Sequence, residues 1–189
     1  MKKILYEGAE AKIFQINDKT LQKIRLEKKY RIKEIDIKLR KQRTKREFKI
    51  LTKLFENNVN VPKPLKIEET KFSFEIEYLK GKTLKNTINE IKLKQAFKQI
   101  IRMHNTGIVH GDLTTLNIID CGKKIFLIDF GLGQFSQKAE DRAVDLHMFW
   151  NCIKNEHNDL YKFKDKLIKK YDLLTLEKLE KLEKRGRNK

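Results

Sequence analysis

The chain has 189 residues, of which 39% are hydrophobic and 37% charged, and its 44 basic and 26 acidic side chains give a net charge of +18. This apolar content argues against a disordered chain, and the apolar stretches are too short to span a membrane. The two cysteines, Cys121 and Cys152, form no CxxC pair, and no histidines or cysteines show the spacing of a zinc site. We therefore expect a soluble, cytoplasmic protein made of one domain or two small lobes.

The first 78 residues are predicted to form a small mixed β-sheet with one main helix. The expected strands are Lys2–Leu5, Ala11–Ile16, Thr20–Leu26, Leu65–Glu68 and Phe72–Tyr78. A helical pattern begins near Arg31 and is clearest over Thr44–Phe55, where Glu47 shares one face with Ile50, Leu51 and Leu54. Residues 57–60 end this helix, and the two prolines that follow make a rigid connection.

The remaining residues, 79–189, are predicted to form a mainly helical part that begins with a hinge at Leu79–Lys82. A helix is expected over Leu93–His104, closed by Gly107, followed by short strands at Ile118–Ile119 and Ile125–Ile128. From about Asp141 the pattern is helical nearly to the end of the chain.

The strongest chemical signal is the segment His110-Gly111-Asp112-Leu113-Thr114-Thr115-Leu116-Asn117, followed after a short strand by Asp129-Phe130-Gly131. An aspartate, an asparagine five residues later and then Asp-Phe-Gly is the layout of the kinase phosphoryl-transfer site. In that layout, Asp112 orients the attacking hydroxyl or water, while Asn117 and Asp129 hold Mg²⁺ on the phosphates of ATP. The motifs therefore predict an α+β, bilobal protein-kinase-like fold, with an N-lobe at 1–78 and a reduced C-lobe at 79–189.

The other half of such a site lies upstream. The third strand offers Lys23 for the phosphates, with Leu21 on the same face to cover adenine. Glu47 is the expected partner of Lys23, because an acid on an apolar helix face needs a cation to offset its burial. Lys12 and Lys19 compete with Lys23 for the role.

The segments that would hold the rest of the nucleotide carry weaker signals. Gly8 is the only glycine of the expected phosphate-covering loop, and an ordinary hairpin turn explains this segment equally well. Backbone groups from Glu77 to Leu79 are expected to meet adenine.

Two departures from ordinary protein kinases bear on the substrate. Gly111 stands where the kinase catalytic loop has arginine, which pairs with a phosphorylated activation loop. Only residues 132–140 separate Gly131 from Asp141, and no Ala-Pro-Glu follows. The site is thus complete for ATP but poorly equipped for a peptide substrate.

These residues, taken along the whole chain, resemble the PRPK-like small atypical kinases of the KEOPS complex, which makes threonylcarbamoyladenosine on tRNA. The matching segments are Gly8-Ala9-Glu10-Ala11, Lys23-Ile24-Arg25, Arg43-Thr44-Lys45-Arg46-Glu47, the two motifs above, Asp141-Arg142-Ala143-Val144-Asp145-Leu146 and Arg185-Gly186-Arg187. The Arg-Thr-x-x-Glu helix and the terminal Arg-Gly-Arg separate this group from RIO kinases and antibiotic phosphotransferases.

The resemblance implies a serine/threonine kinase that uses ATP and Mg²⁺, autophosphorylates when alone and hydrolyses ATP within the complex. It implies as partners the metal-dependent tRNA-modifying subunit, a small subunit that binds the N-lobe, and tRNA. Arg185 and Arg187 belong to the basic tail that contacts tRNA in this group, although the tail here is less basic than usual. The resemblance also supports Lys23 and Glu47, which lie inside matched motifs.

Two other functions remain open from the sequence. The His-Gly-Asp motif also suits a phosphotransferase for small alcohols, although the chain has little room for the helices that build an acceptor pocket. A non-catalytic, basic RNA-binding scaffold would explain the charge, since residues 19–49 hold 14 basic and 4 acidic side chains. Solvated helix faces in a lysine-rich chain explain the same charge without a partner.

Overall fold

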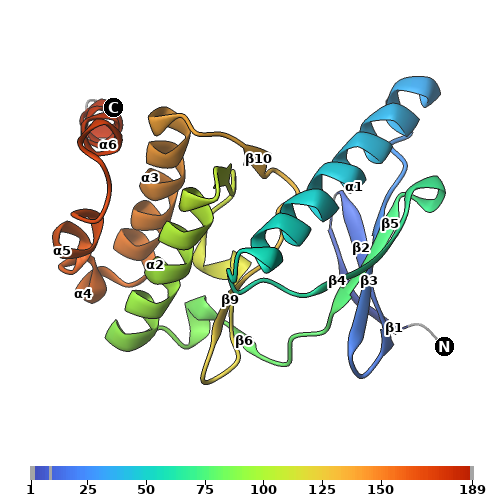
Figure 1. The fold of residues 1–189 in the computed structure, drawn as a ribbon, viewed down its shortest axis with the longest axis horizontal. Coiled ribbons are helices and arrows are strands. Elements are labelled where there is room, and N and C mark those ends of the chain that lie inside the picture. Colours follow the sequence, from blue (N-terminus) through green and yellow to red (C-terminus); the bar gives the residue numbers. More distant parts are fainter. Residues whose placement is uncertain (1–2, 9, 188–189) are drawn as a thin grey trace.

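The computed structural model describes residues 3–8 and 10–187, with side chains described as far as Lys184. Two lobes lie side by side, a β-sheet crossed by the long helix α1 and a group of helices that ends with the C-terminal helix (Figure 1). The fold class expected from the sequence, α+β and bilobal, is confirmed. The division at residue 78 remains a prediction. Within the described residues, no helix is both long and apolar enough to cross a membrane.

The N-terminal lobe is a five-stranded sheet with the strand order β1-β2-β3-β5-β4. Its strands are β1 (Lys3–Glu7), β2 (Ala11–Asn17), β3 (Thr20–Arg25), β4 (Pro64–Glu68) and β5 (Ser73–Glu77). Helix α1 (Lys33–Glu56) connects β3 to β4. The expectation of a mixed sheet is wrong, because every pairing in this sheet is antiparallel. The helical crossover makes β4 run in the direction of β3, but β5 lies between them and is antiparallel to both.

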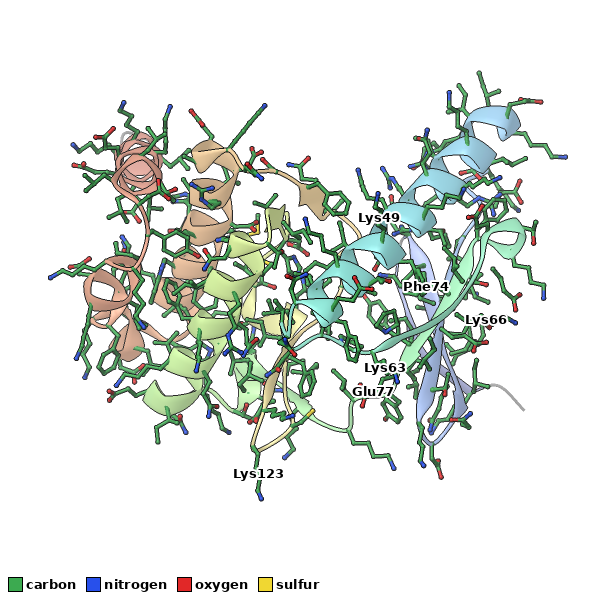
Figure 2. All side chains as sticks on the ribbon, in the orientation of Figure 1. Lys49, Lys63, Lys66, Phe74, Glu77 and Lys123 are labelled. Atoms are coloured by element: carbon green, nitrogen blue, oxygen red, sulfur yellow. The ribbon has the colours of Figure 1, made fainter. Side chains whose placement is uncertain are left out.

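Helix α1 packs on the sheet through the face that its helical period predicts. Ile50, Leu51 and Leu54 are buried, and the Phe48 and Phe74 rings meet edge to face with centroids 6.0 Å apart. Figure 2 shows Phe74 between α1 and the strands. Pro64, which cannot donate a ladder hydrogen bond, begins the edge strand β4, where a missing donor is tolerated.

The C-terminal lobe is built mainly of helices around two small sheets. The helices are α2 (Glu90–Asn105), α3 (Ala139–Glu156), α4 (Asn158–Tyr161), α5 (Lys164–Ile168) and α6 (Leu173–Arg187). The short strands are β6 (Lys82–Thr83), β7 (Ile108–Val109), β8 (Ile118–Asp120), β9 (Ile125–Leu127) and β10 (Gln134–Phe135). Strand β10 pairs with β7, and β8 lies between β6 and β9.

One continuous apolar core joins the lobes. It runs from Leu54 of α1 and Phe74 of β5 to Phe97 of α2 and Trp150 of α3, all nearly inaccessible to solvent. This shared core fixes β3 and α1 relative to the loops that follow β7 and β9. The candidate active site lies where these elements meet.

Candidate active site

A cavity of about 380 Å³ lies between the sheet and the loops of the C-terminal lobe. Four residues that the sequence predicted for the site, Gly8, Lys23, Asp112 and Asp129, line it. The other lining residues are Tyr6, Glu10, Ala11, Ile13, Arg25, Gly131 and Leu132. The fold thus brings the lysine of the third strand and both aspartates to one cavity, although they come from distant parts of the sequence.

Lys23 is held between two carboxylates. Its Nζ lies 2.7 Å from Oε1 of Glu47 and 2.7 Å from Oδ1 of Asp129. Burial alone would lower the pKa of Lys23, but the two carboxylates outweigh it and raise that pKa above its ordinary value. The predicted pairing with Glu47 is therefore confirmed. The competing Lys12 instead pairs with Glu7 at 2.8 Å.

Glu47 has a second cationic partner that the sequence analysis did not single out. The Arg25 guanidinium donates to Oε2 of Glu47, and the two side chains are 4% and 2% exposed. Each oxygen of this buried carboxylate therefore faces one cation, Lys23 or Arg25. The two-residue period of β3, which places positions 23 and 25 on one face, could have identified Arg25.

Asp112 and Asn117 form the tip of the loop between β7 and β8. Asp112 is exposed, and the Asn117 side-chain amide donates to its main-chain oxygen at 2.8 Å and to its carboxylate Oδ2 at 2.9 Å. A single 3₁₀ turn over Thr115–Asn117 brings the asparagine back toward the aspartate. With its amide group used in this way, Asn117 has its side-chain oxygen left to meet a cation.

Asp145 of α3 anchors the start of this loop. Its carboxylate accepts the main-chain N–H groups of His110 at 2.6 Å and Gly111 at 2.9 Å, and it lies 3.1 Å from Nε2 of His104. Burial would raise the pKa of Asp145, but His104 and the hydrogen bond from the His110 amide lower it. Asp145 therefore bonds directly to the backbone of this loop. His104 is one of the buried residues of α2.

Gly111 occupies a position that only glycine fits. Its φ is +78°, and a Cβ atom there would lie 2.6 Å from the main-chain oxygen of Leu132. The close approach of two loops therefore requires glycine at the position where other kinases have arginine. His110 has a structural role as well, because its Nε2–H donates to the Ile128 oxygen at 2.9 Å.

Asp129 sits on a tight turn after β9. Its φ of 60° is unusual for a residue with a side chain, and such conformations concentrate at functional sites. The side chain is 48% exposed and faces the cavity, whereas the following Phe130 is buried against the His110 ring. Burial would raise the pKa of Asp129, but the Lys23 ammonium lowers it. The turn thus presents a charged carboxylate to the cavity.

A sequence model of the RIO domain matches residues 6–167 of the chain. The chain belongs to the RIO-domain family. The helix and tail motifs that separate the KEOPS kinases from RIO kinases therefore do not place it outside this family. Its similarity to the KEOPS kinases is also confirmed, because it is 39% identical over 171 residues to the KEOPS complex subunit Bud32 of Pyrococcus abyssi. That alignment covers 82% of this RIO domain protein and 78% of the relative.

Other relatives carry names of the same kind. A probable serine/threonine-protein kinase BUD32 homolog of Archaeoglobus fulgidus is 30% identical, with 97% of this chain and 95% of the relative covered. A probable bifunctional tRNA threonylcarbamoyladenosine biosynthesis protein of Methanosarcina mazei is 32% identical, but only 29% of its length is covered. The Rio2 kinase of Chaetomium thermophilum, solved with ADP, Mg²⁺ and phosphoaspartate, superposes with a TM-score of 0.67 at 13% identity. That superposition covers 99% of this chain and 71% of the other, and it shows the fold.

The donor atoms of this RIO domain fit a magnesium ion that arrives with a nucleotide. Among the described residues, no three His, Cys, Asp or Glu side chains come close enough to hold a metal by themselves. Magnesium is usually held by one or two carboxylates together with phosphate oxygens. The Asp129 carboxylate and the Asn117 side-chain oxygen are donors of this type, and neither is cysteine or histidine, which would favour zinc.

The residues predicted to hold adenine lie outside the cavity lining. Leu21 pairs with Ile76 across β3 and β5. The Glu77 N–H donates to the Lys63 oxygen at 2.9 Å, and its carboxylate accepts the Lys63 N–H, at the end of β5 (Figure 2). Contact of Leu21, Glu77 and Leu79 with adenine therefore remains a prediction.

Two further predicted contacts involve the ends of the chain. The Gly8 N–H donates to the Ala11 oxygen at 3.0 Å, so Gly8 lies in a tight hairpin turn that also lines the cavity. Arg185 and Arg187 fall in the last turn of α6, and their side chains lie outside the described part of the chain. Their contact with tRNA remains a prediction.

Proposed function

We propose that this RIO domain is a small serine/threonine-protein kinase and ATPase that uses ATP with Mg²⁺ as a subunit of a KEOPS assembly that modifies tRNA. The observation that supports it best is the Lys23 ammonium, held by Glu47 and Asp129 in the cavity that Asp112 also lines. This arrangement provides a fixed cation for phosphates, a carboxylate for a metal and a second carboxylate for the attacking group.

Each residue has a chemical task in this proposal. Lys23, oriented by Glu47, binds the α- and β-phosphates of ATP. Arg25 donates to the second oxygen of Glu47 and supplies the counter-charge for that side of the buried carboxylate. Asp112 orients a serine or threonine hydroxyl, or a water molecule, and accepts its proton as the oxygen attacks the γ-phosphorus and ADP leaves. Magnesium, when bound, neutralises the charge that spreads over the phosphates during transfer.

The loop contacts keep Asp112 in place. Asp145 holds the amides of His110 and Gly111, and Asn117 holds Asp112 from the other side through two hydrogen bonds. A group fixed from both sides loses little entropy when the substrate binds, which is how positioning lowers the barrier. All five predicted chemical residues are present, which favours an active enzyme over a non-catalytic scaffold.

The proposed partners are those that the resemblance to the KEOPS kinases implies: the metal-dependent tRNA-modifying subunit, a small subunit that binds the N-terminal lobe, and tRNA on the basic surface. The name of the Pyrococcus abyssi relative places that protein in the KEOPS complex. The name of the Methanosarcina mazei relative connects a similar segment with threonylcarbamoyladenosine.

The test follows labelled ATP with Mg²⁺ and separates free phosphate from phosphoprotein. Wild type and Asp129→Asn are compared, each with and without total tRNA and the tRNA-modifying subunit. Asp129→Asn should abolish both products, because it removes the charge that holds the metal while keeping an oxygen near Lys23. Asp159→Asn, at an exposed position of α4, is the matched control and should react like wild type.

The products separate the candidate functions. Free phosphate that rises with tRNA and the partner subunit would support an ATPase that works within the complex. Phosphate transferred mainly to a panel of small alcohols would support a small-molecule phosphotransferase instead. Undiminished turnover by Asp129→Asn would contradict the assignment of the active site.

A further inference from the structure

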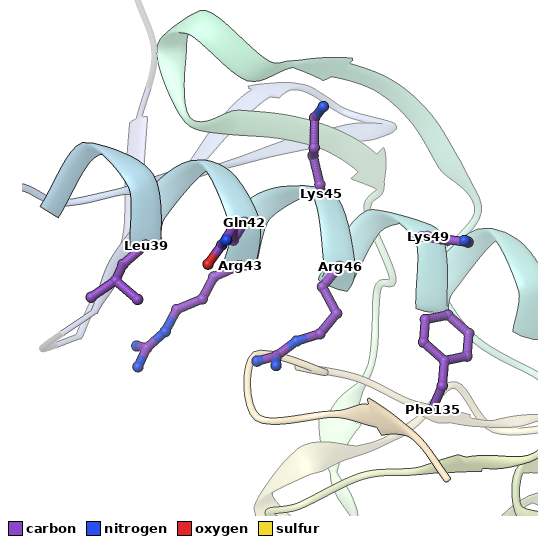
Figure 3. Close-up of a pocket in the computed structure, with 7 residues that line it drawn as sticks. All are labelled: Leu39, Gln42, Arg43, Lys45, Arg46, Lys49 and Phe135. Atoms are coloured by element: carbon purple, nitrogen blue, oxygen red, sulfur yellow. The ribbon is translucent and has the colours of Figure 1, made fainter. Parts of the chain in front are cut away.

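A second and larger cavity, of about 610 Å³, runs between α1 and β10. Figure 3 shows it as an open groove, with the α1 side chains above and Phe135 rising from β10 below. We call it the α1 groove, and it is lined by Leu39, Gln42, Arg43, Lys45, Arg46, Lys49 and Phe135. None of these described lining residues is acidic, and none lines the candidate active site.

The helical period of α1 explains this concentration of positive charge. Leu39, Arg43, Arg46 and Lys49 follow one another at intervals of three or four residues, so they form a stripe along one side of the helix. With a rise of about 1.5 Å per residue, the three cations of this stripe, which follow at intervals of three residues, are spaced about 4.5 Å apart along the axis. The face that carries Glu47 and the apolar residues is buried, so the acid does not neutralise the stripe. The groove therefore presents a row of charges rather than a single cation.

The cations of the groove differ in their partners. Arg43 is paired with Glu10, and Lys45 lies 2.9 Å from Glu69. Arg46 and Lys49 are exposed, and neither has a carboxylate partner among the described residues. These two side chains can therefore take an anionic ligand without breaking an ion pair of the protein.

Phe135 gives the groove an aromatic surface beside this charge. The ring is 42% exposed, and the ammonium groups of Lys49 and Lys53 lie 5.6 and 5.4 Å from its centroid. A cationic groove with an exposed aromatic ring is the arrangement by which proteins bind single-stranded nucleic acids, whose phosphates meet the cations while a base stacks on the ring. An acidic peptide would use the cations but would leave the ring without a partner.

We propose that the α1 groove binds a single-stranded segment of RNA. Arg46 and Lys49 contact successive phosphates, and Phe135 stacks against a base. The choice of RNA over DNA rests on the proposed function, which places the protein in a tRNA-modifying assembly. Phosphate contacts and stacking do not depend on a particular base, so we expect binding with little sequence preference.

The test measures the binding of a short fluorescein-labelled oligoadenosine RNA by anisotropy over a range of KCl concentrations. The double variant Arg46→Glu with Lys49→Glu reverses the two unpaired cations. The matched control, Lys98→Glu with Lys166→Glu, makes the same change of charge at exposed positions on α2 and α5. Thermal unfolding of each variant verifies that the fold is kept.

The groove variant should bind more weakly, and the slope of its log affinity against log salt should be less steep by about 1.4, since each phosphate contact contributes about 0.7. The control should keep the wild-type slope. Phe135→Ala should weaken binding about fivefold or more with an unchanged slope, because stacking does not depend on ions. Equal losses in the groove and control variants would overturn the proposal, since they would show that only net charge matters.

Two competitors identify the class of ligand. Unlabelled oligoadenosine RNA should displace the probe, and oligodeoxyadenosine should displace it as well, because phosphate contacts and stacking do not involve the 2′-hydroxyl group. Polyglutamate that displaces the probe as effectively as RNA would overturn the assignment and indicate an acidic protein partner. The groove variant should hydrolyse ATP at the wild-type rate without RNA, so failure of this proposal is distinguishable from failure of the proposed kinase, which the Asp129→Asn variant tests.

Discussion

Lys23 and Asp129, which stand 106 positions apart in the chain, form an ion pair with 2.7 Å between Nζ and Oδ1. This contact joins β3 of the N-terminal lobe to the turn after β9 in the C-terminal lobe. The two partners differ sharply in environment, because the Lys23 side chain is 8% exposed and that of Asp129 is 48% exposed. Water therefore screens the charge of Asp129. The buried groups Lys23, Glu47 and Arg25 make the larger contribution to the free energy of unfolding.

This difference predicts which substitution costs more stability. Glu47→Gln should lower the free energy of unfolding by about 3–5 kcal/mol, because it leaves Lys23 and Arg25 buried without their shared counter-charge. Lys23→Met should lower the free energy of unfolding by less, because Glu47 remains paired with Arg25 and Asp129 remains exposed to water. Urea unfolding measures both. The control Glu56→Gln, at an exposed position of α1, should stay within about 0.5 kcal/mol of wild type. A greater loss for Lys23→Met would contradict this account.

Two glycines with similar positive φ angles allow the strain of a left-handed residue to be distinguished from a steric clash. Gly111 has φ +78° and a would-be Cβ contact of 2.6 Å with the Leu132 oxygen, whereas Gly122 has φ +82° and open space around it. Gly122→Ala should cost about 1–2 kcal/mol, the strain of a left-handed alanine. Gly111→Ala should cost more and should also abolish ATP turnover, because the loop that carries Asp112 must move. Equal unfolding free energies of the two variants would show that the close approach is unimportant.

Much of the fold follows from local pattern. The two-residue period of Thr20–Arg25 and the helical period around Ile50 place Lys23 and Glu47 on facing surfaces, and their pairing could be predicted from chain order. The order of the sheet could not be predicted in this way, because the position of β5 between β3 and β4 depends on long-range pairing.

The parts of the site that escaped prediction are those fixed by three-dimensional contact. Arg25 shares its strand face with Lys23, but only the fold shows that it reaches Glu47. Likewise, the conformation of Gly111 depends on Leu132, which lies in another loop. Phe135 lies on β10, which the fold places beside the basic face of α1. No local sequence pattern connects those two segments.

A hydrogen-bond chain from the C-terminal helices to the catalytic loop gives a further prediction. The Tyr171 hydroxyl lies 2.7 Å from Nδ1 of His104, which in turn contacts Asp145. Asp145→Asn should cost about 2 kcal/mol, because Oδ2 and Oδ1 each accept one of the His110 and Gly111 N–H groups, and the amide nitrogen that replaces one of these oxygens cannot accept. Those two amides should exchange hydrogen faster, as NMR can measure.

Tyr171→Phe is the graded control for this series of hydrogen bonds, because it removes one hydrogen bond and keeps the ring. It should cost about 1 kcal/mol and speed the exchange of the same amides to a smaller extent than Asp145→Asn. Unchanged exchange at His110 and Gly111 in the Asp145→Asn variant would show that this carboxylate does not hold the loop.

His110 predicts how stability depends on pH. Burial lowers its pKa below the ordinary value of 6.5, and the neutral ring is fully used, because Nε2–H donates to the Ile128 oxygen and Nδ1 accepts the Asp112 N–H at 3.3 Å. As the pH falls below 6.5, the unfolded chain binds a proton that the folded chain resists. The stabilisation is therefore complete above 6.5 and is lost as the pH falls through the lowered pKa of the folded state.

Urea unfolding at several pH values between about 5 and 8 measures this effect in wild type and in His110→Gln. Wild type should lose stability with falling pH in this range, and the variant should lose less, because glutamine can donate to Ile128 but does not titrate. Carboxylates such as Asp145, with lowered pKa values, act only at more acid pH and do not confuse the comparison. Protonation of Nδ1 in the folded protein would also deprive the Asp112 N–H of its acceptor, so ATP turnover should fall only when the pH reaches the lowered pKa of folded His110. An identical pH dependence of stability in both proteins would exclude His110 as its source.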